Sequence, residues 1–483
     1  MRSMCVAILA LTAACTKDAP TAAPEAQVAV CRGTGTSGTI VNVPLSEVVQ
    51  RRGQGDYLVS FLVSKQAGLP QDGAHFSRIA DALAAARAGR LARGETQSAA
   101  CPITITVASG VFRGTAAQST DTTLEHFPIV VDVPGITLRG ALQMAVDANG
   151  RATGAGTGAD VTTLAPIEPL VIVGGVSSQT GSSTSIIVAV GHPGGSAGNG
   201  FTVQGFAFQS GHVGVDTLAG GQGVFSMRVQ NLVIRGNRFE PLLTESMDLR
   251  ASTAAVERNY LSGGAGTCDM CIAGPGVYSV TGNRLAAGAT PGILAVPALL
   301  LPVPAAVEQF VLPATSVIVA TISNNEVRDH LRKPVGAGVR VGAVGVGAPS
   351  VQGTSVVTIQ GNALINNNFA VIVEGAFPVA NTSLRGDLDV TFGGNQLQQS
   401  CQSNLLVSFS RHTTALGLSS LPYLRNSTFT LTLRGNLNWS DAWFSDPGGL
   451  GNSLIVDGQT IANGERQLYD ANRTCTATLA QRN

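Results

Sequence analysis

Hydrophobic and polar residues alternate in short segments that recur along the second half of the chain. Seven segments share one template, in which alternating apolar residues lead to a turn containing asparagine and an apolar residue follows two places later. The aligned asparagines are Asn237, Asn259, Asn283, Asn325, Asn362, Asn395 and Asn436. Because successive side chains of a strand point to opposite faces, this alternation predicts strands that bury one face only.

The spacing of these segments predicts a solenoid. Successive aligned asparagines are 22, 24, 42, 37, 33 and 41 residues apart, and self-similarity of this kind is typical of repeat architectures. The short gaps predict single coils, the gaps near 42 predict two coils, and the gaps of 33 and 37 predict one coil with an insertion. We expect the asparagines to stack at equivalent turns near the solenoid surface, where their amides can form a hydrogen-bonded ladder.

The N-terminal third resembles a known family of β-helix proteins. Residues 72–87 (DGAHFSRIADALAAAR) read as a loop followed by an amphipathic helix, which we place at 75–88. The strands CPITITVASGVFRG (101–114) and FPIVVDVPGITLRG (127–140) follow. This order resembles the start of pectin-lyase-like proteins, including pectin methylesterases and, more closely, uncharacterised β-helix domains. The resemblance covers roughly residues 66 to 440.

The resemblance implies an all-β fold, a right-handed parallel β-helix with an N-terminal capping helix. A solenoid needs caps at both ends because its terminal coils expose core and strand edges. The repeats stop after Trp439, and we therefore assign the last segment to the second cap. The predicted organisation is a signal peptide at 1–14, a disordered tether at 15–30, the N-terminal cap and first coils at 31–140, β-helix coils at 141–440 and the C-terminal cap at 441–483.

Composition agrees with stacked strands and excludes one class of partner. The chain has 58 glycines, and charged residues make up only 12% of it, which suits short strands joined by tight turns better than a helical bundle. Thirty basic residues balance thirty acidic ones. A net charge of zero argues against nucleic acid, because binding to phosphates needs a basic surface.

The first residues predict export. Arg2 precedes the apolar run 6–11, and small residues then lead to Cys15, as in a secretory signal peptide. Small residues directly before a cysteine also resemble a bacterial lipobox, which predicts lipid on Cys15 and an outer-membrane or cell-surface lipoprotein. An ordinary cleaved signal, giving a periplasmic or secreted protein, is the alternative.

Cysteine number agrees with an oxidising compartment. Apart from Cys5 and Cys15, the chain has an even number of cysteines, and their order suggests disulfides that tie both ends of the domain to its body. The suggested pairs are Cys31–Cys101, Cys268–Cys271 and Cys401–Cys475. The C-x-x-C spacing of the central pair also occurs in redox and zinc sites, but no βαβ pattern or second such pair accompanies it.

Two places carry candidate chemistry. Asp387 and Asp389 lie two residues apart on a predicted strand and would share a face at about 7 Å, a usable separation for paired carboxylates. The segment around them resembles a motif of pectin methylesterases, whose partner motifs are missing. The polar run Asp329, His330, Arg332 and Lys333 could serve acid–base chemistry or grip an acidic sugar. Each segment can equally be a solvated strand face or loop.

No complete signature of pectin methylesterase, polygalacturonase or pectate lyase occurs, so whether the protein is an enzyme stays open. The histidines are scattered singly, and nothing indicates a metal or a cofactor. Two function classes remain. The first is a surface protein that binds or displays a long solenoid face to glycan or protein, and the missing signatures favour it. The second is a lyase, hydrolase or esterase acting on an acidic polysaccharide.

Overall fold

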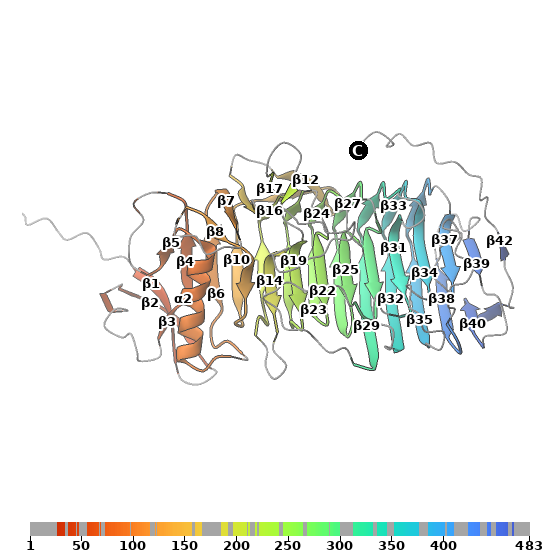
Figure 1. The fold of residues 1–483 in the computed structure, drawn as a ribbon, viewed down its shortest axis with the longest axis horizontal. Coiled ribbons are helices and arrows are strands. Elements are labelled where there is room, and N and C mark those ends of the chain that lie inside the picture. The colour runs from red at the N-terminus through yellow and green to blue at the C-terminus, as the bar shows by residue number, and fades with distance from the viewer. Residues whose placement is uncertain are drawn as a thin grey trace, which may run out of the picture.

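The chain forms a right-handed parallel β-helix, as the sequence predicts. In the computed structural model it coils repeatedly through three sheets that run along one long axis (Figure 1). Each regular coil adds one strand to each sheet, and the strands of successive coils pair in parallel. The structure describes residues 27–467 with gaps at 34–36, 45, 48–55, 67, 69–72, 97, 116–120, 122, 157–159, 167–184, 192–196, 210, 213–217, 220–221, 241–244, 264–267, 289, 300–312, 332–335, 345–351, 376–384, 401–402, 410–423, 435–441, 446–450 and 462–465.

We number the sheets in the order in which a coil visits them. Sheet 1 contains β5 (His75–Phe76), β4 (Ser60–Val63), β6 (Ile103–Val107), β10 (Ile136–Arg139), β15 (Thr202–Gln204), β20 (Leu232–Arg235), β23 (Thr253–Glu257), β26 (Gly276–Thr281), β29 (Thr315–Ser323), β32 (Gln352–Gln360), β35 (Gly386–Gly393), β38 (Thr428–Arg434), β40 (Ser453–Val456) and β41 (Gln459–Ile461). Sheet 2 contains β8 (Glu125–His126), β7 (Gly110–Thr115), β13 (Thr162–Pro166), β16 (Phe206–Phe208), β21 (Arg238–Phe239), β24 (Tyr260–Leu261), β27 (Arg284–Ala286), β30 (Glu326–Arg328), β33 (Ala363–Ile365) and β36 (Gln396–Gln398). Sheet 3 contains β9 (Ile129–Val131), β14 (Ser185–Val190), β19 (Gln222–Met227), β22 (Met247–Arg250), β25 (Met270–Ala273), β28 (Ile293–Val296), β31 (Ala337–Gly342), β34 (Phe369–Glu374), β37 (Ser403–Ser408), β39 (Ala442–Ser445) and β42 (Arg466–Gln467).

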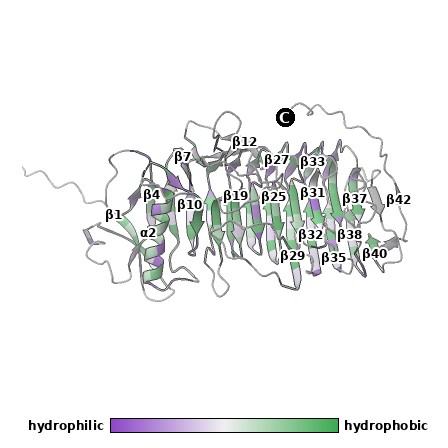
Figure 2. Cartoon of the chain, in the orientation of Figure 1, coloured by the Kyte–Doolittle hydropathy of each residue, from purple (hydrophilic) through white to green (hydrophobic). Residues whose placement is uncertain are grey.

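Aligned apolar columns fill the interior of the helix. Ile234, Val256, Val280 and Ile322 are register partners on successive strands of sheet 1, and each is fully buried. Parallel pairing without slippage places like residues above one another, so one alternating pattern per coil builds a continuous core. Figure 2 shows the apolar residues following the strands along the axis.

Sheet 1 and sheet 3 differ in what their outer faces meet. Strands of sheet 1 alternate between buried and accessible positions, as in β29 and β32. In sheet 3, every residue of β22, β25, β28 and β34 is buried, so both faces of this sheet are covered. Its strands therefore read as nearly continuous apolar runs, a pattern expected for sheets buried on both sides.

An asparagine ladder closes the turn between sheet 1 and sheet 2. The Oδ1 of Asn283 accepts hydrogen bonds from the backbone N–H of Asn259 (2.9 Å) and from its Nδ2 (3.0 Å). Asn259 Nδ2 also donates to the carbonyl of Ile234 at 2.9 Å. The same pattern links Asn237, Asn259, Asn283, Asn325, Asn362 and Asn395. Asn436 lies outside the described residues.

The ladder lies inside the turn, which corrects the expectation that these side chains stand near the surface. Asn237, Asn259 and Asn283 are each 0% exposed. The residue before each ladder asparagine has a positive φ, as at Gly282 (+69°) and Gly361 (+64°). That left-handed residue turns the chain so sharply that the following asparagine points inward, which explains the Gly-Asn pairs of the template.

The structure corrects the number of coils that the longest gaps in the template predict. The gap of 42 residues between Asn283 and Asn325 was expected to hold two coils, yet these asparagines are direct neighbours in the ladder. Between them the chain forms a single coil, β27, β28 and β29, with extra residues between β28 and β29. The strands preceding Asn395 and Asn436, β35 and β38, are likewise adjacent. Coil length varies because extra residues lie outside the strands, where the ladder does not constrain them.

The N-terminal end is covered by helix α2 (Ile79–Ala92), the predicted cap at slightly shifted bounds. The helix was expected at 75–88, but His75 and Phe76 pair in parallel with β4 and form β5 instead. Glu125 starts the helix by accepting hydrogen bonds from the N–H groups of Ile79 (2.7 Å) and Ala80 (3.2 Å). Burial raises the pKa of the Glu125 carboxyl, against the opposing effect of these N–H donors.

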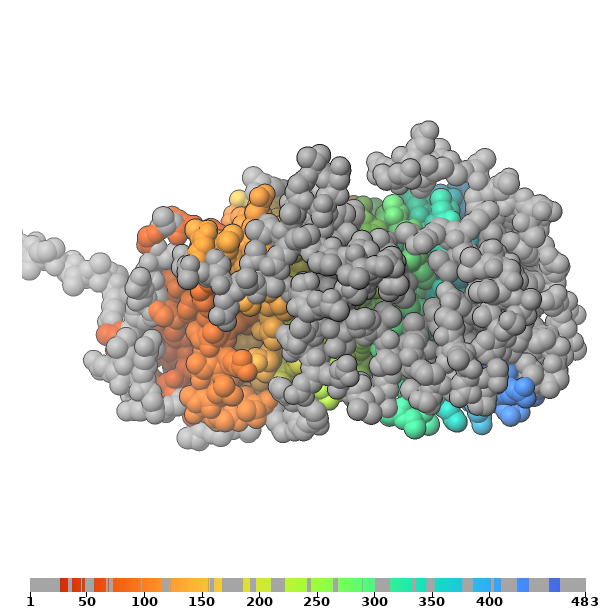
Figure 3. All heavy atoms as spheres, in the orientation of Figure 1, coloured from red at the N-terminus to blue at the C-terminus, as the bar shows by residue number. Residues whose placement is uncertain are grey.

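A small antiparallel sheet and antiparallel hairpins complete the two ends. At the N-terminal end, β1 (Gln27–Arg32) pairs with β2 (Thr39–Pro44) and β3 (Tyr57–Leu58). At the other end, β41 folds back on β40 and β42 pairs in antiparallel fashion with β39. In the space-filling view the two ends of the described chain, coloured red and blue, lie at opposite ends of the long axis (Figure 3). Among the described residues, no helix is long and apolar enough to cross a membrane.

The ladder should contribute measurably to stability. Asn283→Ala removes the acceptor for two donors of Asn259 and leaves them buried without partners. Since each such group costs about 1–3 kcal/mol, we expect the free energy of unfolding to fall by at least about 2 kcal/mol in denaturant titrations. Gln396→Ala is the matched control, because it truncates an exposed amide next to the ladder residue Asn395. Equal stability of the two variants would contradict the structural role of the ladder.

Candidate functional site

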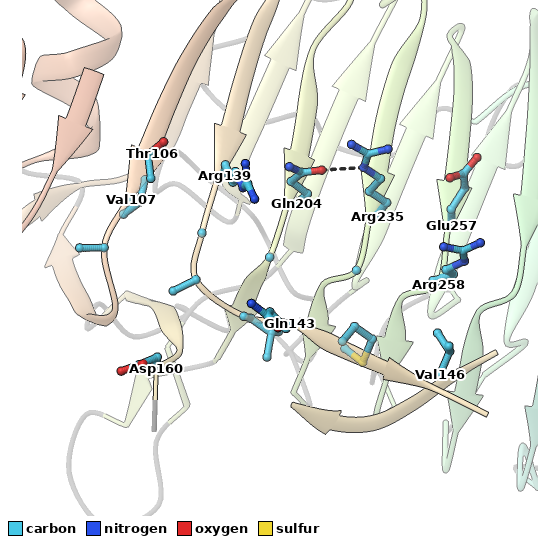
Figure 4. A pocket seen from close by; sticks show the side chains of 17 residues that line it. Thr106, Val107, Arg139, Gln143, Val146, Asp160, Gln204, Arg235, Glu257 and Arg258 are labelled. Carbon is cyan, nitrogen blue, oxygen red and sulfur yellow. Dashed lines mark hydrogen bonds between the residues drawn. The ribbon is translucent and has the colours of Figure 1, made fainter. Parts of the chain in front are cut away.

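A groove runs along the edge of sheet 1 in the N-terminal half of the β-helix. It has a volume of about 760 Å³ and is lined by the ends of β6, β10, β15, β20 and β23 together with residues of an inserted hairpin (Figure 4). Five consecutive coils contribute to it, so the groove is elongated along the helix axis. A polymer lying along this axis would meet one set of side chains from each coil.

Polar side chains form one row along the groove. Thr106, Arg139, Gln204, Arg235 and Glu257 are register partners on neighbouring strands. They occupy the last outward position of each strand, and adjacent strands are about 4.7–4.9 Å apart. Arg235 Nε donates to Gln204 Oε1 at 2.6 Å, and this hydrogen bond fixes both side chains within the row (Figure 4).

The opposite wall is a hairpin inserted between β10 and β13. Its strands are β11 (Met144–Val146) and β12 (Ala152–Gly156), and Gln143, Met144 and Val146 line the groove. The hairpin extends along the axis across several coils. Its residues contact turns of coils that lie far away in the sequence. Ala152 donates to the carbonyl of Gly282 at 2.9 Å, for example.

Side-chain contacts hold the tip of the hairpin on the coils. Arg151 Nε donates to Asn324 Oδ1 at 3.2 Å, and Arg151 Nη2 donates to the carbonyl of Gly361 at 3.3 Å. Asn324 Nδ2 returns a hydrogen bond to the carbonyl of Asn149 at 2.7 Å. We call residues 144–156 the strap. Two register pairs alone would hold so short a hairpin weakly, so these contacts fix the groove wall.

The groove carries more positive than negative charge. Arg139, Arg235 and Arg258 line it with exposed side chains, against the carboxylates of Glu257 and Asp160. Asp160 precedes β13 in the coil of β10, and Glu257 ends β23, which lies three strands further along sheet 1. Three strand spacings along the axis are about 14 Å. The two carboxylates are therefore too far apart to act together on one glycosidic bond, which requires roughly 5–9.5 Å.

The carboxylates proposed from sequence lie elsewhere on the same sheet. Asp387 and Asp389 both point to the outer face of β35, as their spacing predicts, but outside the groove. Asp387 is engaged, since Arg385 Nη2 donates to its Oδ2 at 2.9 Å and the N–H of Thr428 donates to its Oδ1 at 2.9 Å. Asp387 therefore links its strand to the neighbouring strand β38.

The polar run after β30 divides into a surface residue and a buried one. Asp329 has a positive φ and accepts hydrogen bonds from Arg328 Nε (2.9 Å) and Asn366 Nδ2 (2.7 Å). His330 is 0% exposed, and its Nε2 lies 2.9 Å from Oδ2 of the equally buried Asp269. A fully buried imidazole cannot reach a ligand in solution, so His330 is not part of a solvated loop. Arg332 and Lys333 lie outside the described residues.

Sequence reasoning missed the groove residues and two buried ion pairs on sheet 3. Asp248 binds Arg250 through Oδ1 and Nε at 2.9 Å, and Arg340 Nε donates to Glu374 at 2.7 Å. These charged residues interrupt apolar strands, a signal that could have marked them. The groove arginines gave no such signal, because each is one polar residue at the end of a different alternating strand.

Two of the three suggested disulfides are formed in the structure. Cys31 pairs with Cys101, with a Cα–Cα distance of 5.9 Å, and ties the small N-terminal sheet to the first coil. Cys268 pairs with Cys271 beside β25. Cys401 and Cys475 lie outside the described residues, as does Cys15. Within the described ranges, no three His, Cys, Asp or Glu side chains are grouped as ligands of a metal ion.

Comparisons with known proteins define no family. No family model matches the chain, and no curated protein matches its sequence. Among solved structures, the A-module of the Azotobacter vinelandii mannuronan C-5 epimerase AlgE6 is 12% identical, with 84% of this chain and 100% of that chain covered and a TM-score of 0.26. The catalytic domain of a GH87 alpha-1,3-glucanase in complex with tetrasaccharides is 10% identical (82% and 69% covered, TM-score 0.33). The tailspike protein of the E. coli bacteriophage HK620 is 13% identical (89% and 82% covered, TM-score 0.29).

The structural class of this protein therefore follows from its fold and its candidate site. It is a right-handed parallel β-helix protein with a charged axial groove, whose wall is an inserted strap.

The strap contacts can be tested without a ligand. Arg151→Ala removes the hydrogen bonds from Arg151 to Asn324 and Gly361, so we expect faster amide exchange in residues 144–156 and unchanged exchange in sheet 1. At about 0.5–1.5 kcal/mol for each of the two hydrogen bonds, the acceleration should be about fivefold to a hundredfold. Arg385→Ala, which removes an exposed guanidinium directly before β35, is the control for loss of charge. Unchanged exchange in the strap of the Arg151 variant would show that other contacts hold it.

Proposed function

We propose that this protein is an exported, lipid-anchored β-helix protein of the pectin-lyase-like kind that binds a glycan in its axial groove. The observation that carries this proposal is the row of hydroxyl, amide and guanidinium groups supplied by five consecutive coils. A glycan chain presents hydrogen-bonding groups at short, regular intervals along its length. A solenoid presents its side chains in the same way.

The chemistry of the groove favours a glycan over a protein partner. Protein interfaces are built around an apolar, aromatic-rich core. The lining of this groove contains no aromatic residue and has three arginines, two glutamines and two carboxylates. Planar guanidinium groups bind carboxylates through paired hydrogen bonds, so acidic sugars are suitable ligands.

Binding without catalysis is the simpler function for this groove. The two lining carboxylates are separated by about three strand spacings along the axis, and a pair for acid–base hydrolysis must flank a single bond. The alternative is a lyase, hydrolase or esterase acting on an acidic polysaccharide. The observation in its favour is the surplus of arginines, which could hold the carboxylates of such a substrate.

A panel of neutral and uronic-acid polysaccharides tests both functions in one set of measurements. We expect saturable calorimetric binding of acidic polymers that weakens with salt, and no release of reducing or unsaturated ends. The double variant Arg139→Gln/Arg235→Gln should weaken binding at least about tenfold, since hydrogen bonds to charged groups contribute about 1.5–3 kcal/mol each.

Arg385→Gln serves as the control, because it removes a positive charge directly before β35, outside the groove. Equal losses in both variants would contradict the assignment of the groove. The appearance of new chain ends would support the enzyme instead.

The proposed anchor has its own test. Cys15→Ser removes the acceptor for lipid, so we expect the variant to fractionate as a soluble exported protein while the natural chain stays with membranes. Mass spectrometry of the natural protein should find a lipidated cysteine at the mature N-terminus. An unmodified N-terminus at Thr16 or later would leave plain secretion as the route.

A further inference from the structure

The charge of the polar row alternates from strand to strand. Along the polar row, Thr106 and Gln204 are neutral, whereas Arg139 and Arg235 are cationic. The fifth coil contributes Glu257 and, directly after it, Arg258, whose charges cancel. Along this row, with Arg258 counted beside Glu257, the charges are therefore zero, plus one, zero, plus one and zero. Asp160 adds one carboxylate from the loop before β13, outside the row.

Strand geometry fixes the distance between the two cationic coils. β15 lies between β10 and β20, so the Cα atoms of Arg139 and Arg235 are two strand spacings apart, about 9.5 Å. Gln204 accepts the hydrogen bond from Arg235 Nε, which leaves the two terminal nitrogens of that guanidinium for a ligand. Within the described residues, no hydrogen bond or ion pair involves the guanidinium of Arg139, which is exposed.

We propose that the groove selects a polysaccharide that carries a carboxylate on every second sugar, lying parallel to the helix axis. This inference rests on the proposed glycan-binding function and specifies its ligand class. Each guanidinium takes one carboxylate, while Thr106, Gln204 and the Glu257 coil contact the intervening neutral sugars. An extended chain advances by about one strand spacing per sugar, so its acidic groups recur at the spacing of the arginines.

A polymer with a carboxylate on every sugar fits this groove less well. In the same position it would place one carboxylate beside Gln204, which offers only a neutral amide, and another beside the carboxylate of Glu257. Like charges at close range disfavour binding, so the groove discriminates by repulsion as well as by attraction.

The test compares three polymers of matched length on the full-length protein. Hyaluronan carries a carboxylate on alternate sugars, polygalacturonate carries one on every sugar, and dextran carries none. We expect hyaluronan to bind about tenfold more tightly than polygalacturonate per binding site, and dextran more weakly than both. Calorimetry at two salt concentrations separates this preference from nonspecific attraction between charges.

Two variants change the charge pattern of the groove. Gln204→Arg supplies a cation on the intervening coil and should reduce the preference for hyaluronan at least about threefold. Glu257→Gln removes the repulsion and should strengthen polygalacturonate binding about threefold with little effect on hyaluronan. Gln360→Arg is the matched control, since the exposed Gln360 lies in the same row three strands beyond Glu257 and outside the groove lining. It should leave the preference unchanged, and the melting temperatures of all variants report folding.

The outcomes separate this inference from the function on which it rests. Equal or tighter binding of polygalacturonate by the natural protein would overturn the alternating ligand and leave glycan binding intact. A change of preference in Gln360→Arg as large as that in Gln204→Arg would overturn it as well. If none of the three polymers binds, and the wider panel also fails, the glycan-binding function falls and the inference falls with it.

Discussion

The buried asparagine ladder is the interaction on which the rest of this structure depends. The side-chain amide of a ladder asparagine donates both to the asparagine of the next coil and to a strand carbonyl of the preceding coil. Asn283 Nδ2, for example, donates to Asn325 Oδ1 and to the carbonyl of Val256. The amide therefore fixes both the turn and the register between neighbouring coils. A slip of one residue would turn every interior side chain outward, so the ladder and the apolar columns support the same register.

Fixed register also makes the surface periodic, and this periodicity creates the site. Residues at equivalent positions of successive coils stand one strand spacing apart, whether they are buried valines or exposed arginines. Thr106, Arg139, Gln204, Arg235 and Glu257 form a straight row for the same reason that Ile105, Leu138, Val203, Ile234 and Val256 form a straight column inside. The strap then converts one edge of this row into a groove, and it binds the same turns that the ladder holds.

A feature could be predicted from the sequence when the residues that produce it lie close together in the chain, and not when they lie far apart. The fold and the ladder residues up to Asn395 could be read from the chain because each coil repeats its own local signal. The number of coils could not, since insertions such as the one between β28 and β29 lengthen a coil without adding strands. The burial of His330 could not be predicted either, because its partner Asp269 lies 61 residues earlier. Asp269 precedes β25 of sheet 3, whereas His330 follows β30 of sheet 2. The groove arginines are separated in sequence by 96 residues (139 to 235) and meet only through parallel pairing.

The same geometry explains why this surface suits recognition better than catalysis. A catalytic centre requires several groups to converge on one atom, whereas a solenoid edge spreads its groups along a line at equal intervals. Convergence needs residues from a second direction. Among the described residues, the strap and Gln143 before it face the row with amide and apolar side chains, and Asp160 adds a single carboxylate. The groove thus combines regularly spaced cations with a wall of amide and apolar side chains, an arrangement suited to the axial polymer that we propose as its ligand.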